Sequence, residues 1–550
     1  MKPQRLFYIL LILWVIADLL QAALTPVHAD EAYYALFGQH LDWGYYDHPP
    51  MVALLTAFSS LFFHGNLSIR FATTLLHGGT VWLIWNTLPH KSLTNKDVWT
   101  FFAIAASLVM FSVYGFITTP DAPLLFFTAL FFFLYRRYLS APNWPLAMAI
   151  GITTAAMLYS KYMAVLVTGF VLLSNLKLLK DKRVWGAILL AALFFVPHIL
   201  WQVHHDFPSF QYHLFGRNDG FRLLYPLEYI PNQLLVFNPV CLCLALYFCW
   251  KKRNTEEPFE RACLFTIAGF LLFFWVMTIK GHAEPHWTNA AAVPIILLLW
   301  QELRNEQWDK WLIRGIVPVA GLLLLGRITL IVLGSNKVHL IGRERMIADM
   351  HAYCGQTPVV FTNGFQYPAL YTFYTGGQAT EISSFYSRFT QYDLWQSDLE
   401  LQGKRVCLIG EAETKRPIPG STLIRTPDAY FAFREVESFQ GANRLQVTVD
   451  SQQVIGDTLY LQMTFHNPYK LDYHFDNPDF PSVIHLGFME DGHHLTVICP
   501  TPPDLVIPAG GNTTISSAVC PMPGSPFVVC VDNDVCRSVN SKPIKIQHHD

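Results

Sequence analysis

The sequence contains few charged residues for its length. Only 14% of the 550 residues are Asp, Glu, Lys or Arg, against about 25% in ordinary soluble domains. The formal net charge of −2 gives no support for binding to nucleic acid. No GxGxxG or P-loop pattern indicates a nucleotide site, and no CxxC pair indicates a structural zinc site. This shortage of charge leaves a membrane protein as the expected class.

Apolar residues make up 52% of the chain and are gathered into long runs. The runs recur as far as Leu333, and many are long enough to cross a hydrocarbon core of about 30 Å. The first run is expected to be a retained span rather than a signal peptide, because it contains Asp18 and lacks a small-x-small cleavage motif. About eleven spans are predicted, at 6–24, 68–88, 99–117, 122–139, 144–160, 162–176, 184–203, 233–250, 262–279, 287–303 and 312–333.

Basic residues are distributed unequally between the two sets of connecting segments. Sixteen Lys and Arg residues fall in the N-terminus and in every second connection, and five fall in the opposite set. By the positive-inside rule, the richer set, with the N-terminus, is cytoplasmic. An odd number of spans then places residues 334–550 outside the cytoplasm. The five basic residues of the external set are Arg70, Lys161, Arg217, Arg222 and Lys280.

Five polar clusters fall on this predicted external face. Ionisable residues at membrane depth are costly and tend to be functional, so their convergence suits a single active site. Residues 49–63 are too short for a span, and we expect an interfacial helix that begins at Pro49-Pro50. The clusters are DE at 30–31, DHPP at 47–50, TTPD at 118–121, YSKY at 159–162 and KGHAEPHW at 280–287.

Several of these residues also have a purely structural explanation. The aromatic residues of 33–46 could form an interfacial belt. Asp30 and Glu31 could stabilise the first turn of a helix. Asp121 could belong to a turn, and Lys161 could extend its amine toward the interface. These explanations account for each cluster singly but not for their common face.

A lipid-linked sugar would use such a set of residues. Transfer of the sugar needs a carboxylate that takes a proton from the acceptor. It also needs cations and hydrogen-bond donors that hold the departing phosphate. The candidate carboxylates are Asp30, Glu31, Asp47 and Asp121. The candidate phosphate ligands are Lys161, Lys280, His48, His282, His286, Arg217 and Arg222.

Taken in order, the motifs DEAYY, LxWGYYDHPP, TPDAPL, SKY and EPHW resemble those of polytopic GT-C glycosyltransferases. The resemblance is strongest to a bacterial branch related to protein O-mannosyltransferases and lipid A aminoarabinose transferases, and it covers about residues 1–333. It implies inverting transfer of a hexosyl or pentosyl group from an undecaprenyl- or other polyprenyl-phosphate sugar. It also implies a bacterial inner-membrane protein with a periplasm-facing site. The acceptor would be lipid A or another glycolipid, a surface glycan or a protein.

The resemblance also assigns expected roles to individual residues. Asp30 matches the catalytic acid of the first external loop, and Asp121 matches a second acid. The lysine that contacts phosphate in aminoarabinose transferases is replaced here by Asp47-His48, so that His48 or Lys161 would have to supply the contact. In the expected mechanism Asp30 is the general base, Glu31 and Asp121 orient the substrates, and the phosphate ligands are Lys161, Lys280 and His286. Further substrate contacts are assigned to Asp47, His48, His282, Glu284 and Arg217. No cofactor is certain: some relatives bind a divalent metal, but the spacing assigns no ligands here.

The polar tail is predicted to form an α/β segment at 334–435 and a β-sandwich at 436–550. Alternating apolar residues at 445–449 and 459–465 predict two strands of the sandwich. The tail could bind an acceptor glycan or protein, or it could cap the active site. Disulfides are expected among its last four cysteines if it faces an oxidising compartment, with open connectivity. Those cysteines are Cys499, Cys520, Cys530 and Cys536.

Two other classes of protein remain as alternatives. A transporter or flippase for lipid-linked oligosaccharides would have polar residues along the middle of its spans and discontinuous helices. A surface-anchored binding protein would need only one span. The position of the acids at one end of the predicted bundle favours the glycosyltransferase.

Overall fold

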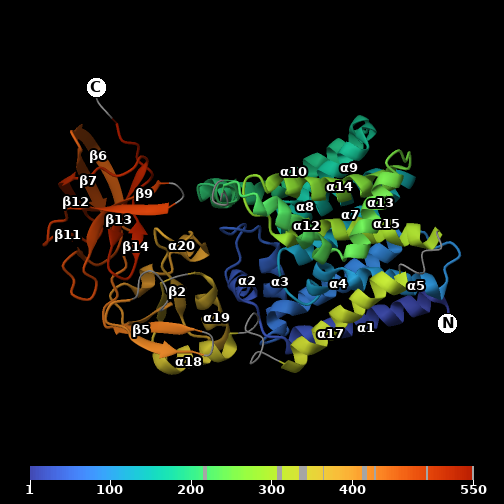
Figure 1. The fold of residues 1–550 in the computed structure, drawn as a ribbon, viewed down its shortest axis with the longest axis horizontal. Coiled ribbons are helices and arrows are strands. Elements are labelled where there is room, and N and C mark those ends of the chain that lie inside the picture. Colours follow the sequence, from blue (N-terminus) through green and yellow to red (C-terminus); the bar gives the residue numbers. More distant parts are fainter. Residues whose placement is uncertain are drawn as a thin grey trace. The chain divides into compact units, whose positions relative to one another are not determined.

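The computed structural model describes residues 1–214, 220–305, 312–333, 343–362, 364–411, 418–426, 429–490 and 493–547. The chain forms two compact units, Met1–Gly342 and Arg343–Asp550 (Figure 1). The first unit is helical, and the second combines helices with strand-rich sheets. This confirms a helical membrane unit followed by a strand-rich tail. The subdivision of the tail at 435/436 stays a prediction.

Every predicted span of the first unit coincides with one or more helices. The helices are α1 (Pro3–Leu24), α2 (Ala29–Gln39), α3 (Met51–Ser60), α4 (Leu67–Thr87), α5 (Asn95–Ser107), α6 (Val109–Val113), α7 (Asp121–Ser140), α8 (Trp144–Ser160), α9 (Ala164–Ser174), η1 (Leu176–Lys180), α10 (Lys182–His204), α11 (Pro208–Leu214), α12 (Leu224–Val236), α13 (Pro239–Lys251), α14 (Pro258–Met277), η2 (Pro285–Ala291), α15 (Ala292–Asn305), η3 (Leu312–Ile316) and α17 (Val317–Leu333).

The predicted count of eleven spans is not confirmed. Within the described ranges, five helices are long and apolar enough to cross a membrane, or six if the bent pair α12 and α13 is one span. Several predicted spans are shortened because their helices break. The span at 99–117 is divided at Leu108, and α12 meets α13 at an angle of 103°. A helix shorter than about 17 residues does not reach across a bilayer core by itself.

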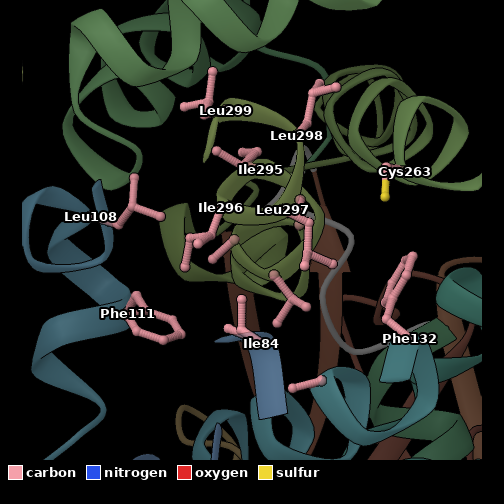
Figure 2. Packing of buried hydrophobic residues seen from close by; sticks show 14 of the residues in the cluster. Ile84, Leu108, Phe111, Phe132, Cys263, Ile295, Ile296, Leu297, Leu298 and Leu299 are labelled. Atoms are coloured by element: carbon pink, nitrogen blue, oxygen red, sulfur yellow. The ribbon is translucent and has the colours of Figure 1, made fainter. Parts of the chain in front are cut away.

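The core of the first unit surrounds α15. Residues Ala292 to Trp300 are all buried, which is typical of a helix that is apolar on every side and enclosed by others. Figure 2 shows the side chains of Ile295–Leu299 among buried neighbours. These include Ile84 of α4, Leu108 between α5 and α6, and Phe132 of α7. The indole nitrogen of Trp300 donates to the carbonyl of Asp97 at 2.8 Å. These contacts hold the helices whose ends carry the polar clusters.

One polar cluster lies inside this bundle. Asp18 of α1 is fully buried, with its carboxylate oxygens 2.7 Å from His77 Nδ1 and 2.6 Å from Arg327 Nη2. The Arg327 guanidinium also lies over the ring of Phe116. The cluster therefore balances the charge of Asp18 and joins α17 to α1 and α4.

The second unit begins with an α/β layer. Its sheet has the order β2-β1-β3-β5-β4, in which β2, β1 and β3 are parallel and β5 and β4 are antiparallel. The elements are α18 (Glu344–Cys354), β1 (Val359–Phe361), α19 (Gln366–Thr375), β2 (Ala379–Glu381), α20 (Gln391–Trp395), η4 (Leu399–Leu401), β3 (Val406–Glu411), β4 (Thr422–Arg425) and β5 (Tyr430–Val436).

The remaining strands form small antiparallel sheets around their own apolar core. One sheet has the order β10-β9-β13-β14, another β12-β7-β6, and β8 pairs with β11. Alternating burial along β7 places Leu459, Leu461, Met463 and Phe465 in the core. The strands are β6 (Gln446–Ile455), β7 (Thr458–His466), β8 (Tyr473–His474), β9 (Val483–Glu490), β10 (His493–Cys499), β11 (Val506–Ile507), β12 (Asn512–Val519), β13 (Phe527–Asp532) and β14 (Arg537–Val539).

The expectation of a disulfide among the last four cysteines is wrong. All four of those cysteines are free, and the bond instead joins Cys354 at the end of α18 to Cys407 in β3. Packing of α18 on the sheet brings these two Cα atoms to 5.9 Å, within the range that a disulfide can bridge.

Glu381 makes the stability of the second unit depend on pH. Burial, with repulsion from Asp393, raises its carboxyl pKa to about 8 from an ordinary value of 4.5. Between these values the folded chain keeps a proton that the unfolded chain releases, so stability falls as pH rises. We expect the melting temperature of the full chain in detergent to fall over this interval and Glu381→Gln to flatten the decline. Parallel pH profiles for the two proteins would contradict this account.

Candidate active site

The N-terminus of α2 holds the first pair of predicted acids. The His28 imidazole caps this helix: its Nδ1 atom accepts from the backbone N–H of Asp30 at 3.2 Å. Because Nδ1 is an acceptor there, its 3.8 Å approach to the Asp30 carboxylate is a contact without proton donation. The Asp30 side chain is 38% exposed. It is therefore accessible to a reacting group.

Glu31, the next residue, is fully buried and holds three segments together. One carboxylate oxygen accepts from Arg70 Nε at 2.7 Å and from the backbone N–H of Thr118 at 2.9 Å. The other accepts from Arg70 Nη2 at 2.5 Å and from the backbone N–H of His28 at 3.0 Å. Glu31 thus ties the start of α2 to α4 and to the TTPD segment that leads to Asp121.

Asp121 is the first residue of α7, and Lys161 directly follows the last residue of α8. The two helices are antiparallel, so these ends meet, and Lys161 Nζ donates to both Asp121 oxygens at 2.9 and 2.8 Å. Both side chains are buried. Nε2 of His286, in η2, lies 4.0 Å from the same carboxylate. Asp121 and His286, which are 165 residues apart in the sequence, therefore lie next to each other.

Tyr34 connects this place to the remaining acids. Burial raises the pKa of its phenol, and the nearby carboxylates of Asp30, Asp47 and Asp121 add to the rise. Its hydroxyl lies 3.2 Å from His48 Nε2. The three predicted acids thus lie within electrostatic range of one buried hydroxyl, and His48 contacts that hydroxyl directly.

The other predicted ligands are placed less closely. His282 and Glu284 are 3.8 Å apart and partly exposed, shortly before His286. Lys280 is exposed beyond the end of α14. Arg217 lies outside the described residues. Arg222 lies over the ring of Tyr225. Among the residues that the structure describes, no three His, Cys, Asp or Glu side chains are grouped to hold a metal ion, so no metal ligands are assigned.

Sequence reasoning missed two residues of this region. An interfacial aromatic belt is the explanation that the sequence offers for Tyr34, although its four-residue spacing from Asp30 puts both residues on one face of α2. Arg70 was counted only as a basic residue of the external set, whereas it is the fully buried partner of Glu31. An arginine among apolar residues was the available signal, since a buried charge needs a partner.

Comparison with known sequences finds similarity over part of the chain. Residues 47–201 match the family described as dolichyl-phosphate-mannose-protein mannosyltransferase. The chain is also similar to the lipid A galacturonosyltransferase RgtD of Rhizobium johnstonii, with 24% identity over 305 residues. That match covers 52% of this chain and 63% of RgtD, so the chain spans somewhat less than two thirds of its relative.

Comparison with solved structures identifies the fold. The crystal structure of ArnT from Cupriavidus metallidurans bound to undecaprenyl phosphate has a TM-score of 0.59 and 14% identity, and covers 78% of this chain and 97% of ArnT. The apo form of ArnT gives a TM-score of 0.58. The chain is thus a polytopic membrane protein of the GT-C fold. The resemblance to GT-C glycosyltransferases indicated by its motifs is confirmed.

Proposed function

We propose that this chain moves a sugar from a polyprenyl-phosphate donor to an extracytoplasmic acceptor, with inversion at the anomeric carbon. The observation that carries the proposal is the contact of Asp121 with Lys161 and His286, with the Asp30 and Asp121 carboxylates both within electrostatic range of Tyr34. The partly exposed Asp30 carboxylate would supply a base, and the buried Lys161 amine with the partly exposed His286 imidazole would supply phosphate ligands. These are the two functions that the reaction needs.

In the proposed reaction Asp30 removes the proton from an acceptor hydroxyl. The resulting oxygen attacks the anomeric carbon from the side opposite the phosphate, and the bond between that carbon and the phosphate oxygen breaks. Lys161 and His286 bind the polyprenyl phosphate as its negative charge grows. Asp121 holds Lys161 in place until the donor arrives, so that a buried amine is never without a partner.

Glu31 acts in this proposal as a positioning residue. Its carboxylate accepts hydrogen bonds from Arg70, Thr118 and His28, and these bonds fix the start of α2 relative to the TTPD segment. Asp47, His48, His282, Glu284, Lys280 and Arg217 remain proposed substrate contacts. A lipid A, glycolipid, surface glycan or protein acceptor fits this site, and the similarity to RgtD favours lipid A. The likeness to ArnT with undecaprenyl phosphate supports a polyprenyl donor.

The proposed location is the bacterial inner membrane, with a cytoplasmic N-terminus and a periplasmic tail. The unequal distribution of basic residues supports this orientation. The Cys354–Cys407 disulfide supports it independently, because such bonds persist in oxidising compartments.

A transporter or flippase for lipid-linked oligosaccharides is the second candidate. The buried cluster of Asp18, His77 and Arg327 favours it, because transporters carry ionisable groups within their spans. The bend of 103° between α12 and α13 also fits a discontinuous helix. Neither feature supplies a reason for the acids at the end of the bundle.

Purified protein in liposomes would separate the two candidates. With an undecaprenyl-phosphate sugar and lipid A, we expect mass spectrometry to detect lipid A that has gained one sugar, together with an equal amount of undecaprenyl phosphate. A second assay follows the movement of intact donor between leaflets. Donor that crosses the bilayer while no lipid, glycan or protein acceptor gains a sugar would establish the transporter and exclude the transferase.

A further inference from the structure

Two arginines lie at the end of α7 that is opposite to Asp121. Arg136 is near the last turn of α7, about 22 Å from Asp121 along a continuous helix. Arg261 is at the beginning of α14. The Arg136 guanidinium lies 4.8 Å from the centre of the Phe259 ring, which also belongs to α14. The ends of the two helices therefore meet here, at the far end of the helical unit from the candidate active site.

The two arginines belong to one cluster between these helices. Arg261 is within electrostatic range of the Tyr135 hydroxyl on α7, and Arg136 is within range of the Cys263 thiol on α14. The Tyr135 and Phe259 rings stack with their centres 6.4 Å apart. Cys263 itself belongs to the hydrophobic core shown in Figure 2. The arginines thus stand at the rim of that core.

Both guanidinium groups lack acceptors. In the part of the chain that the structure describes, Nη1 of Arg136 and Nε of Arg261 are enclosed by protein and have no hydrogen-bond partner, and neither arginine forms an ion pair. A charged donor that is removed from water without an acceptor is costly, and charges at membrane depth are usually paired. Both side chains are partly exposed, so a ligand can reach each guanidinium from outside.

The acids within electrostatic range of the cluster are Glu257 and Glu260. Glu257 caps α14 by accepting from the backbone N–H of Glu260. The Glu260 carboxylate pairs with Lys252. Both acids are therefore engaged by other donors, and the arginines still need an acceptor.

An exposed apolar stripe begins beside the cluster. On α14, Arg261 is followed on the same helical face by Phe265, Leu272 and Trp275, which are four, eleven and fourteen residues further along. Their side chains are 42%, 60% and 45% exposed. A phospholipid has the matching form, because it carries a phosphate at one end and long apolar chains below it. A free phosphate would make no use of the stripe.

We propose that this cluster binds an anionic phospholipid, with Arg136 and Arg261 on its phosphate oxygens and its acyl chains along the stripe of α14. Guanidinium groups recognise phosphate through several N–H donors at once, and basic sites between membrane helices bind anionic headgroups. In the orientation proposed above, the lipid belongs to the cytoplasmic leaflet. Sugar transfer is not involved, because the site lies at the opposite end of α7 from Asp121.

Retention of lipid by the full chain in detergent tests the proposal. Native mass spectrometry would compare dioleoyl phosphatidylglycerol with dioleoyl phosphatidylcholine, which has the same chains but no net charge. We expect the anionic lipid to bind roughly 10- to 30-fold more tightly. The double variant Arg136→Gln with Arg261→Gln should lose this preference. Arg253→Gln, at an exposed arginine stacked on Trp250, is the matched control and should keep it.

Two further measurements keep the result interpretable. Excess inorganic phosphate should not displace phosphatidylglycerol, because the acyl chains contribute to binding. If the double variant melts below the parent, the two single variants replace it, since each should lose part of the preference. Equal retention of the two lipids by the parent, displacement by inorganic phosphate, or a full preference in the folded Gln variants would each overturn the proposal.

Discussion

Replacement of Asp30 by Asn is expected to lower the turnover of sugar transfer by roughly 10²- to 10⁴-fold, which is the usual contribution of a general base. The amide keeps the shape of the side chain but cannot take the acceptor's proton. Because the Asp30 side chain is 38% exposed and the helix cap uses its backbone, folding should be unaffected. Initial rates in nanodiscs over a range of donor concentration should show a fall in kcat with little change in KM for the donor.

The matched control is Glu256→Gln, the same loss of one carboxylate at an exposed position between α13 and α14. It should transfer sugar at the parent rate. An Asp30→Asn variant with undiminished turnover would exclude Asp30 as the base and direct attention to Asp47. Asp121→Asn is a poorer test, because it would also leave the buried Lys161 amine without its carboxylate.

The sequence was sufficient to predict which ends of the helices carry the polar clusters. Each polar cluster stands next to an apolar run, and alternate ends of consecutive spans lie on one side of a bilayer. Asp121 at the start of α7 and Lys161 after α8 are predicted to lie on the same side, and the structure joins them by an ion pair. Such topological reasoning needs only the order of the helices.

Contacts that depend on packing between distant helices could not be predicted. The pairing of Glu31 with Arg70 depends on how α2 lies against α4. The disulfide of Cys354 with Cys407 depends on how α18 covers the sheet. The predicted number of spans was not confirmed for a local reason. A window of apolar residues does not reveal that the helix breaks at Leu108, or at Asn238, where φ is 62°. Hydropathy measures composition, whereas the break is a property of backbone conformation.

Replacement of Arg70 by Met is expected to destabilise the first unit by about 3–5 kcal/mol, the usual cost of leaving one member of a buried ion pair without its partner. Glu31 would then hold its charge in a site from which water is excluded. The arginine also donates to the carbonyls of Ala22, in the last turn of α1, and of Thr25 and Pro26, between α1 and α2, and these acceptors would lose their donor. Thermal unfolding of the full chain in detergent measures the loss.

A double variant separates the ion pair from the rest of this network. Because Glu31→Gln removes the buried charge, the pair Glu31→Gln with Arg70→Met should lose less stability than the sum of the single changes. Arg405→Met, at an exposed ion pair, is the control and should leave the melting temperature unchanged. Sugar transfer by Arg70→Met should fall even at temperatures below its melting temperature. The reason is that Glu31 would no longer hold the start of α2 against the segment that leads to Asp121. Asp30, at the start of α2, would then lose its position. An Arg70→Met variant as stable and active as Arg405→Met would show that Glu31 does not position the site.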